Sequence, residues 1–354
     1  MKVLIAPDSF KGSISNFECA EALADGWHSV RPEDQITLRT MADGGEGTLE
    51  TIALQHPDAQ RFSTKVGGAS CWLLLNDGTA IVELANICGI TLEPILDPLH
   101  ASTYRLGLVL KDVVEDSRVK KVLIAVGGSA STDGGVGALL ALGGLFTRDN
   151  GESVSLGGLG LSEITALNLT QILPAPSDGV VCLTDVNIFL LGELGSARLF
   201  APQKGASEAQ VLQLEAGLIH LQKISKRSDF PGAGAAGGTP FGLSLAWDIE
   251  IRSGAESVAE AVNLLEAIRE SDLVITGEGK LDSQSEFGKV VGKVTDMSVK
   301  LGKKIRYCVG SSERQLGEIG ISLVDLAPTL EAALNQPREW LVRAGAELAR
   351  REAG

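Results

Sequence analysis

The segment from Lys120 to Gly143 joins a strand pattern to a loop whose residue types bind anions. The aliphatic run 122–126 is typical of a strand covered on both faces of a parallel sheet. Glycine lets successive backbone N–H groups converge, hydroxyls add donors, and a following helix offers its positive N-terminus. The alternative is a tight turn that needs glycine only for its geometry. We expect a phosphate site formed by Gly127, Gly128, Ser129, Ser131, Thr132, Gly134 and Gly135.

Acidic residues, hydroxyls and a lysine follow three other runs that predict buried strands, at 3–6, 36–40 and 272–276, and an aspartate follows a fourth at 180–184. The carboxyl ends of parallel strands form the usual ligand edge of an open α/β sheet. Carboxylates there suit a substrate hydroxyl or Mg²⁺. The residues that the pattern places at this edge are Asp8, Ser9, Lys11, Asp43, Glu46, Asp185, Glu278 and Asp282.

Other charged residues and a glycine motif leave alternatives open. Glu83 ends an apolar run, where a paired structural carboxylate and a substrate-facing one are equally compatible with the pattern. Asp133 lies inside the glycine loop and would repel a phosphate unless it turns away or binds Mg²⁺. Lys204 is presented by a rigid loop ahead of the helix pattern 208–226. A GxGxxG string starts at Gly232, but no strand pattern precedes it, so we reject a dinucleotide site.

The composition restricts the classes of partner. A length of 354 residues favours two domains, and the 44% hydrophobic content is that of a packed globule. The net charge of −14 argues against nucleic acid and against an anionic membrane surface as main partners. With 42 glycines and only 4% aromatic residues, ligand binding should rely on backbone loops.

Targeting signals and metal-binding cysteine patterns are not found in the sequence. The first apolar run is too short for a signal peptide, and no run approaches the length of a membrane span. The five cysteines and four histidines show no metal-ligand spacing, and the odd cysteine count suits reduced thiols. We therefore expect a cytoplasmic protein, either a monomer or a homodimer.

Secondary-structure patterns divide the chain. Ser15 and Glu18 form a capping-box pattern for a first helix. From about residue 58 apolar and polar residues alternate as they do in antiparallel strands, and 76–78 (Asn-Asp-Gly) predicts a hairpin turn. The last third returns to β/α alternation, with strands expected at 304–309 and 323–326 and a closing helix at 337–351. This predicts one α/β domain of residues 1–57 plus 258–354 and an inserted α/β domain of residues 58–257.

Six strings taken together resemble the bacterial glycerate kinase type 1 family. They are APDSFKGS at 6–13, ADGGEGT at 42–48, GGSASTDGG at 127–135, APQKGA at 201–206, PGAGAAGG at 231–238 and GEGKLDSQ at 277–284. They occur in order over nearly the whole chain. The chain departs from the family pattern after Asp185, where Asn187 is followed by Ile188 instead of a second Asn and a Pro, and at Arg105 and Ala201.

The resemblance implies an enzyme that phosphorylates D-glycerate with ATP, usually at the 2-hydroxyl to give 2-phosphoglycerate. It also implies two α/β domains, a flavodoxin-like one inserted into the other, with the active site in the cleft between them. Phosphoryl transfer requires positioning and charge neutralisation. We expect Asp185 to accept the hydroxyl proton, with Asp8 and Asp282 as competitors, and Lys11 to neutralise the phosphoryl group. Expected substrate contacts are Ser9, Asp43, Glu46 and Lys204, and expected Mg²⁺ ligands are Glu278 and Asp282.

Two other functional classes are weighed against this hypothesis. A non-catalytic sensor of a phosphorylated metabolite would keep the glycine loops but could lose the acidic residues, which are present here. A nicotinamide-dependent hydroxy-acid dehydrogenase would need a strand before its GxGxxG motif, and the sequence shows no such strand.

Overall fold

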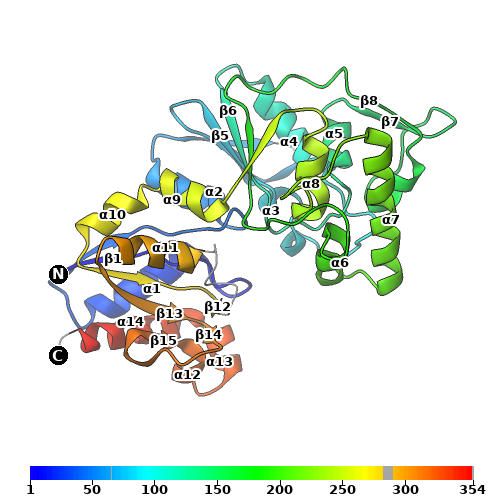
Figure 1. Ribbon diagram of the computed structural model, residues 1–354. Coiled ribbons are helices and arrows are strands. Elements are labelled where there is room, and N and C mark those ends of the chain that lie inside the picture. The colour runs from blue at the N-terminus through cyan, green and yellow to red at the C-terminus, as the bar shows by residue number, and fades with distance from the viewer. Residues whose placement is uncertain (65, 282–289, 353–354) are drawn as a thin grey trace. The chain divides into compact units, whose positions relative to one another are not determined.

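The computed structural model describes residues 1–64, 66–281 and 290–352. The chain divides into two compact units. The terminal unit contains residues 1–43, 50–55 and 253–354, and the inserted unit contains residues 44–49 and 56–252. In Figure 1 the terminal unit runs in blue and then from yellow to red, while the inserted unit runs mainly from light blue through cyan to green.

The terminal unit is built on a parallel sheet with the order β15-β13-β11-β1-β2. Its strands are β1 Lys2–Ile5, β2 Gln35–Leu38, β11 Leu273–Thr276, β13 Lys304–Val309 and β15 Gly320–Ser322. Numbered within this unit, the order is 2-1-3-4-5, which is the flavodoxin-like order. The family resemblance implied that the flavodoxin-like domain is the inserted one, whereas the observed strand pairing gives this order to the terminal unit.

Helices cover both faces of this sheet (Figure 1). Val3 and Ile5 of β1 pack with α1 and α14, whereas the alternate residue Leu4 packs with α9, α10 and α11. This alternation follows from the period of two along a strand. The helices of the unit are α1 Asn16–His28, α9 Gly254–Ala261, α10 Leu264–Glu270, α11 Val290–Lys300, α12 Leu323–Leu326, α13 Leu330–Asn335 and α14 Pro337–Arg351.

Two local predictions in the terminal unit have different outcomes. The capping box is confirmed, since the Ser15 side chain accepts from the Glu18 N–H and the Glu18 carboxylate accepts from the Ser15 N–H. The strand predicted at 323–326 is wrong, because these residues form α12 and the short strand β15 precedes them. A four-residue apolar run does not distinguish a strand from a buried helical turn.

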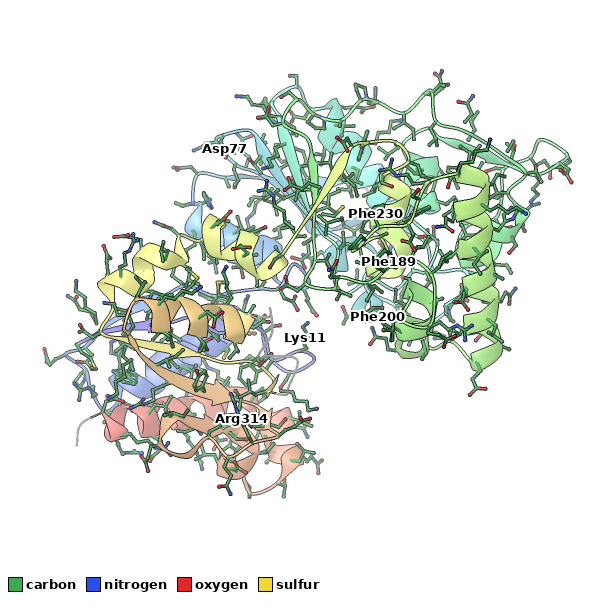
Figure 2. All side chains as sticks on the ribbon, viewed as in Figure 1. Lys11, Asp77, Phe189, Phe200, Phe230 and Arg314 are labelled. Carbon is green, nitrogen blue, oxygen red and sulfur yellow. The ribbon has the colours of Figure 1, made fainter. Side chains whose placement is uncertain are left out.

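The inserted unit has a six-stranded mixed sheet with the order β10-β9-β6-β5-β4-β3. Its strands are β3 Gln60–Thr64, β4 Gly67–Leu74, β5 Thr79–Glu83, β6 Lys121–Ala125, β9 Val180–Leu183 and β10 Ile249–Arg252. Strands β3 to β5 are antiparallel neighbours, and β5, β6, β9 and β10 are parallel. The predicted hairpin is confirmed: β4 and β5 flank the turn, and Asp77 (Figure 2) accepts from the Thr79 N–H at 2.8 Å.

In one hydrophobic cluster of the inserted unit, α4, α5 and α8 pack on one face of β4, β5, β6 and β9, and a second cluster joins α5, α6 and α7. The helices are α3 Ala85–Cys88, α4 Tyr104–Glu115, α5 Val136–Ala141, α6 Ser196–Phe200, α7 Glu208–Ser225 and α8 Ala235–Leu243. Helix α2 Thr48–Gln55 has its first two residues in this unit and the remainder in the terminal unit. A small ribbon, β7 Leu145–Thr147 with β8 Ala166–Asn168, completes the unit.

Two further findings concern membrane-spanning helices and the cysteine thiols. Within the described ranges, no helix has both the length and the apolar character that a membrane span requires. Cys19, Cys88, Cys182 and Cys308 are buried free thiols.

Candidate functional site

A cavity of about 320 Å³ opens at the carboxyl ends of strands β1, β11 and β13 of the terminal unit. The chain leaves β1 for β2 on one side, and β11 is the neighbour of β1 on the other side. This is the topological switch point of the sheet, where open α/β folds bind their ligands. The cavity brings together five of the predicted residues: Asp8, Ser9, Lys11, Asp43 and Glu278.

Asp8 is the most deeply buried of the five, at 5% exposed. Its carboxylate accepts one backbone hydrogen bond, from the Ser9 N–H at 2.7 Å. Burial raises the pKa of Asp8 to about 8, and the charge of Asp43 adds to this, while Lys11 opposes it. A carboxyl group with this pKa exchanges its proton near neutral pH, as a group that takes part in proton transfer must.

Lys11 projects from the loop that follows β1 (Figure 2) and is exposed. Its ammonium group donates to the Asp43 carboxylate at 3.0 Å. Partial burial lowers the pKa of Lys11, but the charges of Asp43 and Asp8 outweigh this and raise it above its ordinary value. The cavity therefore has a permanent positive charge beside its acidic groups.

The Ser9 side chain provides a further polar group in the cavity. Its hydroxyl oxygen is buried and has no hydrogen-bond partner among the residues that the structure describes. A buried hydroxyl that is unsatisfied by protein is a donor that a ligand can use.

The fit of Mg²⁺ to this cavity depends on its carboxylates. Glu278 is 8% exposed and lines the cavity together with Asp8 and Asp43. In the described part of the chain, no three or more His, Cys, Asp or Glu side chains are grouped closely enough to hold a metal on their own. Mg²⁺ is usually held by one or two carboxylates and by substrate phosphates, so these side chains suit a metal that arrives with a nucleotide. Asp282 lies outside the described residues.

The parallel strands of the inserted unit bring a second set of predicted residues to one sheet edge. Glu83 ends β5, the glycine loop follows β6, and Asp185 follows β9. Glu83 is fully buried and accepts from the Gly47 N–H at 3.0 Å and the Leu49 N–H at 2.8 Å. These groups belong to the start of α2, so Glu83 stabilises that helix terminus, and the structural alternative for this residue is the correct one.

Asp133 has turned away from the open side of the glycine loop. It is fully buried, and its Oδ2 atom accepts from the Thr103 N–H and the Thr103 hydroxyl, both at 2.8 Å, and from the Gly137 N–H at 3.2 Å. The N-terminus of α5 therefore already holds an anion supplied by the protein. A phosphate group is not needed there to satisfy the helix dipole.

The second half of the glycine loop is engaged in packing. The Gly134 N–H donates to the Gly237 carbonyl at 2.9 Å, and a Cβ on Gly134 would lie 2.4 Å from Leu221. A Cβ on Gly135 would lie 2.8 Å from the Thr239 carbonyl oxygen. The close approach of α7 and α8 therefore requires glycine at both positions, and phosphate binding by these two residues stays a prediction.

The first half of the loop is more accessible. Gly128 is exposed and has a φ of +76°, and Gly127 before it is partly exposed. The Ser131 and Thr132 hydroxyl oxygens are buried and have no partner among the described residues. Phosphate binding stays a prediction for this half of the loop.

Lys204 is buried, at 3% exposed, and supports the same loop. Its ammonium group donates to the Ser129 hydroxyl at 2.9 Å and to the Ser131 carbonyl. Burial lowers the pKa of Lys204 to about 8, although Asp133 opposes this. The observed contacts of the Lys204 ammonium group fix the backbone of the loop. Its role in substrate binding stays a prediction.

Asp185 and Glu46 lie in the inserted unit, outside the cavity of the terminal unit. Asp185 is partly buried directly after β9, and Glu46 is exposed in the segment before α2. Their predicted roles in proton transfer and substrate binding stay predictions.

Sequence reasoning missed an apolar side of the terminal-unit cavity. Leu330 and Leu334 of α13 are 61% and 56% exposed, and both line the cavity. Leucines four residues apart lie on one face of a helix, and this spacing was the available signal. Nothing in the local sequence indicates that this face meets the loops after β1 and β11.

A family model with the description "Glycerate kinase family" matches residues 3–352. The chain belongs to the glycerate kinase family. It is 35% identical to glycerate 2-kinase of Escherichia coli K12 over 99% of this chain and 97% of that protein. It is 34% identical to a glycerate kinase of Halalkalibacterium halodurans over 98% of this chain and 97% of that protein.

A solved structure agrees with these comparisons. It is a crystal structure from Salmonella typhimurium LT2 of a protein assigned as glycerate kinase 2. The TM-score is 0.77 with 29% sequence identity, over 100% of this chain and 98% of that one. The family resemblance inferred from the six sequence strings is therefore confirmed, and with it the expectation that the chain is an enzyme.

Proposed function

We propose that this enzyme transfers the γ-phosphoryl group of ATP to the 2-hydroxyl of D-glycerate, giving 2-phosphoglycerate and ADP. The observation that carries the proposal is the terminal-unit cavity, where a buried carboxyl and an ion-paired lysine meet at the switch point of a parallel sheet. Family membership supports the reaction class.

Asp8 is the group in this cavity best suited to accept the proton of the glycerate hydroxyl. It lines the cavity, and its pKa of about 8 lies close to the pH at which a general base works efficiently. Lys11 would neutralise the negative charge of the transferred phosphoryl group, which is the main requirement of phosphoryl transfer. The sequence predicted Asp185 as the base with Asp8 as a competitor, so Asp185 is the alternative to this assignment.

The remaining proposed contacts complete the charge balance. Ser9 would donate its unpartnered hydroxyl to substrate, and Gly127, Gly128 and Ser129 would contact nucleotide phosphates. Glu278 and Asp43 would hold Mg²⁺ through carboxylate oxygens. When bound, the metal neutralises charge on the phosphate oxygens.

The test is a coupled assay of ADP formation with Mg-ATP and one of D-glycerate, L-glycerate, glycolate or lactate. We expect turnover with D-glycerate to exceed that with the other acids by at least about tenfold, because L-glycerate has the opposite configuration and glycolate and lactate lack the 3-hydroxyl group, so that the reacting hydroxyl is not positioned. Phosphorus NMR of the product distinguishes the 2-phosphate from the 3-phosphate. ADP formation no faster than without an acceptor would exclude the proposal.

No observation favours the alternatives. Three of the carboxylates that a sensor could lose, Asp8, Asp43 and Glu278, line one cavity. The glycine string at 232–237 follows α7 and a turn, with no strand directly before it. That glycerate and ATP meet between the two units stays a prediction, as do the oligomeric state and the cytoplasmic location.

A further inference from the structure

The terminal-unit cavity has two chemically different sides. Its polar side carries charged and hydroxyl groups: Asp8, Ser9, Lys11, Asp43, Glu278 and Lys280. The other side is an apolar wall formed by Leu323, Val324, Leu330, Ala333, Leu334 and Pro337. The wall comes from three consecutive elements, α12, α13 and the start of α14.

The two leucines of α13 are the most exposed members of the wall, at 61% and 56%. Each exposes apolar area whose burial is worth about 25 cal/mol per Å². The other apolar members of the wall are buried or partly buried. Phe10 and Leu281 are buried as well. An apolar surface that faces a charged cavity therefore indicates a ligand with one apolar part and one polar part.

The two substrates of the proposed reaction differ in this respect. Each carbon of glycerate carries oxygen, so the molecule has no apolar surface to place against leucine side chains. The purine ring of ATP has two flat faces of low polarity. The cavity volume of about 320 Å³ lies at the lower end of the range for sites that enclose ligands larger than glycerate.

We propose that the apolar wall of the terminal unit binds the adenine ring of the nucleotide, with Leu330 and Leu334 on one face of the purine. This inference rests on the proposed function and assigns the base to one unit. The switch point beside β1 places the polar side of the same cavity, including Lys11, next to the bound nucleoside. The inference concerns the base alone.

The experiment compares nucleotide binding by calorimetry in the absence of glycerate, and a separate steady-state assay gives the KM for D-glycerate. In the Leu330→Gln/Leu334→Gln variant, side-chain volume and charge are nearly kept while the apolar contact is lost. Val299→Gln is the matched control, because Val299 is 64% exposed on α11 of the same unit and does not line the cavity. The titrants are ATP, GTP and inorganic triphosphate.

We expect the double variant to bind ATP about tenfold more weakly or worse, with inorganic triphosphate unchanged and with the KM for D-glycerate within about twofold of wild type. The control should bind all three titrants as the wild type does. Unchanged ATP affinity in the double variant overturns the inference, and so does a raised KM for glycerate with unchanged ATP affinity.

The outcomes separate this inference from the proposed function. If the wild-type enzyme binds ATP but forms no ADP with glycerate, the proposed function fails while the binding comparison still tests the wall. If the wild-type enzyme turns over and the leucine variant keeps its ATP affinity, the inference alone fails.

Discussion

Three buried carboxylates in this enzyme differ in the number of backbone hydrogen bonds that they accept. Asp133 and Glu83 are fully buried, and each accepts two or more hydrogen bonds from backbone N–H groups. Asp8 accepts one such bond, and its burial, together with the charges of Asp43 and Glu278, raises its pKa. The first two acids stabilise helix termini, whereas the third is poised for proton transfer.

The first prediction assigns the proton-accepting role. Asp8→Asn should lower kcat by about 10²-fold or more, the usual contribution of general acid–base catalysis, and leave ATP binding nearly intact. Asp185→Asn is the matched comparison and should keep kcat within about tenfold of wild type. Steady-state kinetics and ATP titrations of both variants measure this. Loss of turnover in the Asp185 variant alone would transfer the role to Asp185.

The same group predicts a dependence of stability on pH. The pKa of Asp8 is about 8 in the folded protein and 3.8 as an ordinary value, so the native state holds a proton that the unfolded chain has lost between these limits. The contribution of Asp8 to stability is therefore present below the unfolded value and is lost as pH rises through the folded value.

Because asparagine carries no charge at any of these pH values, Asp8→Asn should be relatively more stable at high pH. We expect its Tm relative to wild type to increase by about a few °C between mildly acidic pH and pH near 9. Thermal denaturation of both proteins across this range measures the difference. A constant difference in Tm would show that the pKa of Asp8 is not raised.

Lys11 permits a test in which activity and stability are separated. Its pair with Asp43 is exposed on the lysine side, and exposed pairs contribute about 0–1 kcal/mol. Lys11→Met should therefore leave the free energy of unfolding nearly unchanged while lowering kcat by about 10²-fold, because charge on the phosphoryl group is no longer neutralised. Lys293→Met removes a comparable pair with Glu256 on α11 and α9 and should leave kcat unchanged. Urea denaturation with activity assays gives both quantities.

At the scale of elements, the two halves of the loop between β6 and α5 make different contacts. Its second half is fixed by Asp133 and by packing against α7 and α8. Lys204 stabilises its first half, because the ammonium group donates hydrogen bonds to the Ser129 hydroxyl and the Ser131 carbonyl. One glycine-rich sequence therefore contains glycines needed for packing and glycines available to a ligand.

Alanine substitutions separate these two roles. Gly128→Ala should fold with a loss of about 1–2 kcal/mol from its φ of +76°. It should raise the ATP KM severalfold, because the new Cβ at this exposed position would occupy the approach path of a phosphate. Gly135→Ala should instead lose stability by about 1–3 kcal/mol or fail to fold, because its Cβ would lie 2.8 Å from a backbone oxygen at a φ of +74°. Denaturant titrations and nucleotide kinetics measure both effects. An unchanged ATP KM in folded Gly128→Ala would remove this loop from the nucleotide site.

At the scale of the whole molecule, the two units interrupt one another in sequence. Residues 44–49 belong with the inserted unit although the flanking residues 43 and 50 belong with the terminal unit. This segment is bonded to the inserted unit by the Glu83 carboxylate, which accepts from the Gly47 and Leu49 N–H groups, and by the Gly44 carbonyl, which accepts from the Gly127 N–H at 3.0 Å.

This predicts where the inserted unit can be cut from the chain. A fragment of residues 44–252 should be more stable than a fragment of residues 56–252 by about 2–4 kcal/mol. In the shorter one Glu83 is left buried without these two partners, and such a loss is strongly destabilising. Restoration of stability by Glu83→Leu in the shorter fragment would identify the carboxylate as the cause. Equal urea midpoints for the two unmodified fragments would contradict the prediction.

The sequence by itself determined the family and the position of most elements. The six strings are contiguous, so residue identity alone identifies them, and buried strands such as 273–276 are recognisable because their pattern is local. The capping box at Ser15 and the hairpin at 76–78 were predictable for the same reason, since their partners lie within a few residues.

Only the tertiary structure decided which unit has the flavodoxin-like strand order, because strand pairing joins residues as distant as β1 and β11. It also decided the roles of identical residue types. Gly128 and Gly135 are indistinguishable in sequence, yet one is exposed and the other packs against Thr239. The apolar wall beside Asp8 likewise forms only when α13 approaches the loop after β1, some three hundred residues away in the chain. Burial and charge at the site depend on these long-range contacts, and no local pattern encodes them.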